Sequence, residues 1–162
     1  MNVYTSLGDK KKLIGPGSVD ILKSADESRT STTVAIDGDL VKTVVAGGVY
    51  EFWISTSVTT ATTGQIKYDW GGTATATTFM AWAWTISSTH LSVTITQTWD
   101  LKTSLGGAGS VMACFPDAAN EFFAKGTIVV NAGGTFGLTW ASDTGPSVTV
   151  NRDAYMMIRR IS

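Results

Sequence analysis

The strongest constraint on the fold is the alternation of apolar and polar residues in the last part of the chain. Between Gly126 and Ile161, apolar side chains recur largely at every second position, and glycine-containing clusters interrupt them. A period of two is typical of a β-strand, since successive side chains point to opposite faces. The sequence therefore predicts strands here, with a hairpin turning at Ala132-Gly133-Gly134 and a last strand over 154–161 that pairs within a sheet.

Similar short apolar runs recur along most of the chain, and no segment keeps a helical period. The clearest runs cover residues 33–37, 40–45, 49–55, 65–70, 79–84, 91–99 and 111–115. Asp37-Gly38-Asp39 separates the first two and predicts a tight turn, because nothing nearby completes the ligand set of a calcium loop. We count nine or ten strands. The predicted fold is all-β, an antiparallel β-sandwich or jelly roll.

The first residues differ from the rest and predict an extended N-terminal arm. Residues 1–23 contain a three-lysine run and Gly15-Pro16-Gly17, so we place the arm there and the β-sandwich domain in 24–162. Val19 to Leu22 suits either a short strand or a turn of helix. The arm is either a disordered terminus or a segment that orders on a partner. In the second case the candidate partner-binding residues are Val3, Tyr4, Lys10, Lys11, Lys12, Leu13 and Ile14.

Charge and hydropathy disfavour two classes of partner. The chain has 12 Lys plus Arg against 13 Asp plus Glu, which leaves no broad basic surface for nucleic acid. No apolar run approaches the roughly 18 to 20 residues that span a bilayer, and no signal peptide is visible. We therefore expect a protein made in the cytoplasm, without nucleic-acid binding or membrane insertion.

No catalytic constellation is recognisable. The only cysteine, Cys114, has apolar neighbours that favour a buried thiol over a nucleophile, and the only histidine, His90, lacks a partner for a metal site. The acidic residues that suit carbohydrate cleavage stand in no recognisable frame. They are Glu51, Asp69, Asp117, Glu121, Asp143 and Asp153. We predict no enzymatic activity, no catalytic residues, no cofactor and no metal.

Three tryptophans are the candidates for a subunit interface or for the core. Trp53 lies opposite the predicted core face of its strand, and Trp82 and Trp84 share one side of another. Side chains of this size are rarely left exposed without a function. Core or subunit contact is the favoured interpretation, and a stacking platform for a sugar ring or a base is the alternative.

Several stretches from Ala25 to the end of the chain resemble a β-domain that recurs in structural proteins of tailed bacteriophages. These stretches are residues 25–33, 39–40, 44–52, 126–128, 134–136, 138–141 and 154–161. The resemblance implies a virion component, with a jelly roll similar to the trimeric heads of the tumour-necrosis-factor and complement type. Such domains often end long tail proteins, whereas here only the short arm precedes the domain.

The expectation is therefore a homotrimeric capsid decoration (cement) protein or head-fibre protein of the virion. Its arm would bind the major capsid protein or another virion protein. One alternative is a tail-tip or receptor-binding module that recognises host surface glycans through Trp82 and Trp84. Another is an unrelated lectin-like or carbohydrate-active β-sandwich of cellular origin.

Overall fold

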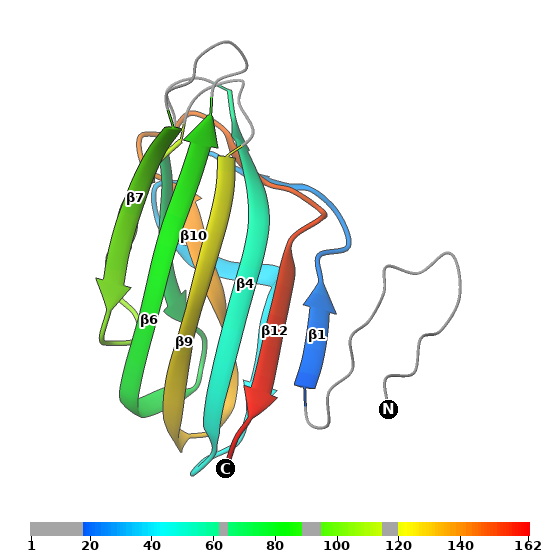
Figure 1. Ribbon diagram of the computed structural model, residues 1–162, viewed down its shortest axis with the longest axis vertical. Coiled ribbons are helices and arrows are strands. Elements are labelled where there is room, and N and C mark those ends of the chain that lie inside the picture. The colour runs from blue at the N-terminus through cyan, green and yellow to red at the C-terminus, as the bar shows by residue number, and fades with distance from the viewer. Residues whose placement is uncertain (1–17, 62–64, 89–94, 115–119) are drawn as a thin grey trace.

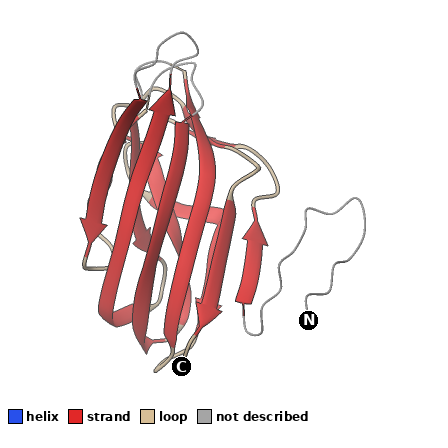
Figure 2. Ribbon diagram, in the orientation of Figure 1, coloured by secondary structure: helices blue, strands red, loops and turns tan. Residues whose placement is uncertain are grey.

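The residues that the structure describes form an antiparallel β-sandwich of twelve strands, which confirms the predicted all-β class (Figures 1 and 2). The computed structural model describes residues 18–61, 65–88, 95–114 and 120–162. These ranges hold no helix, and therefore no helix capable of crossing a bilayer. Two sheets face each other across one apolar core.

The large sheet has six strands side by side, in the order β1-β12-β4-β9-β6-β7, and all its pairings are antiparallel. These strands are β1 (Ser18–Leu22), β12 (Tyr155–Arg160), β4 (Val49–Thr60), β9 (Asn120–Ala132), β6 (Thr75–Ser88) and β7 (Ile95–Lys102). Two short strands, β11 (Val148–Val150) and β2 (Glu27–Arg29), continue this sheet beside the end of β4. The predicted last strand is thus confirmed as β12, which is paired on both sides.

The small sheet lies behind the large one in Figure 1. Its order is β3-β10-β5-β8, and its strands are β3 (Ala35–Val44), β10 (Gly134–Ser142), β5 (Gln65–Gly71) and β8 (Ser110–Ala113). Aromatic rings from both sheets meet between them. The ring of Phe52 in β4 lies 4.6 Å from that of Trp70 in β5 and 5.0 Å from that of Phe136 in β10, measured between centroids. Such tilted contacts suit the quadrupoles of the rings and stabilise the core beyond area burial.

The predicted hairpin at Ala132-Gly133-Gly134 is wrong. The strands on either side of it exist, but β9 pairs with β4 and β6, whereas β10 pairs with β3 and β5. The turn therefore carries the chain from one sheet to the other. Gly134 fits this crossing because a Cβ there would lie 2.5 Å from Thr73 Oγ1 and 2.7 Å from the Ala74 nitrogen. The alternation of apolar and polar residues identifies a strand, but it does not show which strand pairs with it.

The predicted turn at Asp37-Gly38-Asp39 is also wrong, because β3 runs through all three residues. Pairing with β10 shifts register here: Val41 lies opposite Gly137, and Ile36 opposite Thr139. The Asp37 carboxylate accepts hydrogen bonds from the backbone nitrogens of Asp39 and Leu40, both at 2.9 Å. This is the local bonding for which Asp favours turns. Here it produces a bulge inside a strand instead of a reversal.

The last residues of the predicted arm belong to the sandwich. Residues 18–22 form β1 and pair with β12, and Lys23 is buried with its ammonium 2.8 Å from the Asp37 carboxylate. Of the two readings of Val19 to Leu22, the strand is correct. The predicted partner-binding residues, Val3 to Ile14, lie outside the described residues. The sandwich thus begins no later than Ser18, six residues before the predicted domain start at residue 24.

Candidate functional site

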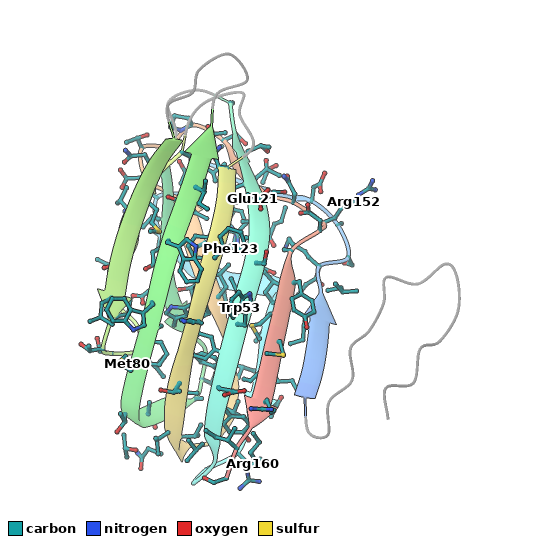
Figure 3. All side chains as sticks on the ribbon, viewed as in Figure 1. Trp53, Met80, Glu121, Phe123, Arg152 and Arg160 are labelled. Atoms are coloured by element: carbon teal, nitrogen blue, oxygen red, sulfur yellow. The ribbon has the colours of Figure 1, made fainter. Side chains whose placement is uncertain are left out.

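The outer surface of the large sheet, opposite the core, carries most of the exposed large apolar side chains. Strand alternation places Phe52 in the core and Trp53 outside, and the same alternation continues in β6 and β9. Trp53, Trp82 and Leu101 are 39%, 43% and 43% exposed. Figure 3 shows Trp53 on this side of the sheet. Isolated exposed apolar residues are common in proteins, but a contiguous group is not.

Register brings these side chains into one row across five strands. Met157 pairs with Trp53, Trp53 with Lys125, Lys125 with Trp82, and Trp82 with Leu101. Directly paired residues on one face have Cβ atoms roughly 5 Å apart, so neighbouring side chains in the row touch or nearly touch. Residues from five strands, far apart in the sequence, thereby form one surface.

A second row supports the first. The Trp84 ring packs at 5.6 Å against Phe123, nearly parallel, and meets Trp53 edge to face at 6.2 Å. Figure 3 shows Phe123 on the same side of the sheet as Trp53. Trp84 and Phe123 are only partly exposed. Trp84, which is itself packed on Phe123, therefore restricts the rotation of the Trp53 ring.

Polar residues border this apolar surface at one edge. Arg159 forms an ion pair with Glu51 at 2.6 Å, and Glu51 lies opposite Thr127, which in turn lies opposite Met80. A groove of about 400 Å³ lies between the first row and the row formed by Glu51, Thr127 and Met80. Its walls include Trp53, Met80, Trp82, Lys125 and Met157. We call the group Trp53, Met80, Trp82, Trp84, Leu101, Phe123 and Met157 the outer apolar face.

All three predicted tryptophans therefore lie on one surface, and none lies in the core of this chain. Five further residues of this surface were not expected from the sequence to belong to a site: Met80, Leu101, Phe123, Lys125 and Met157. Each occupies the position in its strand that alternates away from the core, which is the only signal the sequence offers. Their proximity depends on strand order and register, which a single sequence does not reveal.

The five candidate carboxylates that the structure describes do not converge on one site. Glu51 binds Arg159, while Asp69 and Asp143 face Lys102 and Lys67 at 3.8 Å and 3.6 Å. Asp117 lies outside the described residues. Only Glu121 and Asp153 interact: burial, and then the charge of Asp153, raise the pKa of Glu121. Within the described ranges, no three His, Cys, Asp or Glu side chains are grouped so as to hold a metal ion.

Cys114 is buried, as its neighbours predicted. Burial raises the pKa of its thiol to about 11, although a backbone hydrogen bond at Ile66 lowers it slightly. Since the thiolate is the reactive form, its fraction at pH 8 falls about a hundredfold below that of an ordinary thiol. We expect a soluble thiol reagent to label the native protein very slowly at pH 8, and rapidly once denaturant unfolds it. Rapid labelling of native protein would contradict this burial.

Comparison of the chain with protein-family models gives no match, and comparison with curated protein sequences gives none either. The protein can therefore be assigned only to a structural class, which its fold and its exposed surface define. The protein is an antiparallel β-sandwich whose larger sheet exposes an aromatic-rich outer apolar face.

Proposed function

We propose that this protein is a bacteriophage virion structural protein that assembles as a homotrimer through the outer apolar face. Within that class we propose a capsid decoration (cement) or head-fibre protein. The observation that carries the proposal is the exposure of Trp53, Met80, Trp82 and Leu101 side by side on one sheet. An apolar patch of this kind on a soluble domain favours a protein partner.

The composition of the patch suits a contact between identical copies. Aromatic residues and methionine are enriched at the centres of interfaces, and charged residues at their rims. Here Trp53 and Trp82 lie near the centre on either side of Lys125, and the Glu51–Arg159 ion pair lies at the edge. Most soluble oligomers close with rotational symmetry, so that one patch on each copy meets a patch on its neighbour. The phage assignment and the three-fold symmetry rest on the resemblance of the sequence stretches given above.

The solution mass tests the assembly. Light scattering on the full chain is expected to give three times the 17.1 kDa of one copy. A variant that begins at residue 18 keeps β1 and should give the same stoichiometry, because the proposed interface lies within the sandwich. A monomer in both cases would contradict the proposal. The role of residues 1–17 has a separate test, which measures whether the variant that begins at residue 18 still binds capsids.

The virion assignment needs its own test. Particles purified from the source that encodes the chain should contain its peptides in a fixed ratio to the major capsid protein. Absence of these peptides from intact particles would contradict a virion role but would leave the trimer unaffected.

A second candidate function is recognition of host surface glycans, and the position of Trp53 and Trp82 favours it. Both rings are exposed, and they flank Lys125 beside Glu51, so an apolar sugar face and its hydroxyls would find suitable partners. Trp84 is less suitable than predicted, since Phe123 and Trp53 pack against it. Tryptophan fluorescence that is quenched by acrylamide and altered by glycans would favour this function. In a trimer formed by this face, both effects should be weak.

A further inference from the structure

A buried amine and a buried carboxylate meet where β1 leads into the next segment. Lys23 Nζ lies 2.8 Å from both Oδ1 and Oδ2 of Asp37, and 2.7 Å from Oε2 of Glu27. The side chains of Lys23 and Asp37 are 1% and 0% exposed. Asp37 lies in β3, in the opposite sheet from β1, so this contact joins the two layers.

The Asp37 carboxylate is held by donors on both oxygens. Oδ1 accepts from the backbone nitrogens of Asp39 and Leu40 at 2.9 Å, and Oδ2 accepts from Trp140 Nε1 at 2.9 Å. Two backbone N–H groups on one oxygen are the arrangement that stabilises a developing oxyanion in acyl transfer. The carboxyl carbon is therefore both fixed in position and polarised.

Glu27 is placed to carry protons. Its Oε1 accepts from Arg29 Nε at 2.8 Å, which leaves Oε2 directed at Lys23. The Arg29 guanidinium in turn lies 4.1 Å above the Trp140 ring, so the arginine is itself held in place. Glu27 is about one third exposed, unlike Lys23 and Asp37. The cluster thus contains a nucleophile, an electrophile and a second carboxylate in contact with the nucleophile.

The resting pair is ionic. Burial alone would lower the pKa of Lys23 and raise that of Asp37, but the hydrogen bonds outweigh burial, so the pKa of Lys23 is raised and that of Asp37 lowered. Transfer of one proton along the 2.8 Å contact gives an amine and a carboxylic acid without changing the net charge. A buried site favours such a neutral pair more than water does.

We propose that Lys23 and Asp37 condense to an intramolecular amide bond. After one Nζ proton passes to Oδ2, the amine lone pair attacks Cγ, and the negative charge on Oδ1 is held by the Asp39 and Leu40 nitrogens. Glu27 then takes a second Nζ proton and returns it to the Oδ2 hydroxyl, which leaves as water while the Oδ1 carbonyl re-forms. The amide nitrogen keeps one proton, and no oxidant or cofactor is consumed.

Proximity provides the driving force. Fixed, well-oriented groups react at effective concentrations that reach on the order of 10⁵ M or more, so condensation that is unfavourable between free molecules becomes favourable within one fold. The same burial that excludes water from Lys23 and Asp37 also slows hydrolysis of the product. The structure therefore assigns a self-formed crosslink between the two sheets.

The intact mass of the denatured full chain tests the proposal without any variant. The expected mass is lower than the sequence mass by one water molecule. A mass equal to that of the sequence would overturn the proposal.

Peptide mapping locates the lost water. After digestion with trypsin, the crosslinked protein should give one branched peptide in which residues 13–29 are joined to residues 30–42, because modified Lys23 resists cleavage. An aspartyl succinimide at Asp37-Gly38 would also lose water. In that case the loss would stay on residues 30–42 alone, with cleavage after Lys23, and the proposal would be overturned.

Two variants test the assigned roles. Glu27→Gln should retain the fold but keep the full sequence mass in most molecules, since the proton acceptor is gone. Asp143→Ala, which removes the looser 3.6 Å contact with Lys67, should still lose one water. Complete water loss in Glu27→Gln would overturn the role of Glu27. Loss of the crosslink in Asp143→Ala would show that the effect is not specific to the Lys23 site.

Discussion

Replacing both Trp53 and Trp82 by glutamate is expected to convert the proposed trimer into monomers. Both rings are exposed in the single chain, so their loss should cost the fold little. Buried tryptophans at interface centres typically contribute 2 kcal/mol or more each, or about 30-fold in affinity, and two charges placed in the contact would add repulsion. Light scattering over a dilution series, with circular dichroism to check folding, measures this effect.

Val111→Glu is the matched control for that experiment. Val111 is also an exposed apolar strand residue, at 40% exposure, but it lies in β8 of the small sheet. This variant should assemble like the wild type. A double tryptophan variant that stays trimeric would exclude the outer apolar face as the interface. Dissociation of both variants would point to general destabilisation instead.

Asp37→Ala is expected to lower the free energy of unfolding by about 3–5 kcal/mol. The change leaves the Lys23 charge in a buried site without its main partner and removes the acceptor of the Trp140 indole N–H. Breaking a buried pair by deleting one member costs this much because the remaining charge stays desolvated. The amide proposed above would add to the loss. Denaturant unfolding followed by tryptophan fluorescence measures it.

The comparison for Asp37→Ala is Asp143→Ala. Asp143 and Lys67 lie 3.6 Å apart and are both partly exposed, so solvent screens their attraction. Removing such a pair should cost at most about 1 kcal/mol. Equal losses in the two variants would mean that the Lys23 cluster contributes no more than an ordinary surface ion pair.

Strand positions were largely predictable from the sequence, whereas strand neighbours were not. The alternation over 126–161 identified β9, β10, β11 and β12, because one face of each strand must be apolar. It gave no information on which strands share a sheet, and so β9 and β10 were wrongly predicted as a hairpin. Partner choice depends on contacts between residues far apart in the chain, and a local pattern does not encode them.

Of the residues on the outer apolar face, only the three tryptophans Trp53, Trp82 and Trp84 could be predicted from the sequence. Trp53 was identified because it stands opposite the core residues of its own strand. Lys125 and Leu101 became part of the same surface through register, which places them beside Trp82. The cluster of Lys23, Glu27 and Asp37 was not predicted, because Lys23 follows β1, Glu27 lies in β2 and Asp37 lies in β3, where a turn was expected. When the partner of a buried charged residue is distant in the sequence, the residues next to that charge do not show that it will be buried.

The pairing of β1 with β12 has a mechanical consequence. Ser18 lies opposite Arg159, and Leu22 lies opposite Tyr155. A force that pulls Ser18 away from Arg159 therefore opens this ladder like a zipper, one hydrogen-bonded step at a time, instead of shearing all its bonds together. The opening fork then reaches Lys23, which is anchored to Asp37 in the other sheet. A force applied at Ser18 would thus detach β1 from β12 and stop at the Lys23–Asp37 contact, before any load reaches the central strands of the two sheets.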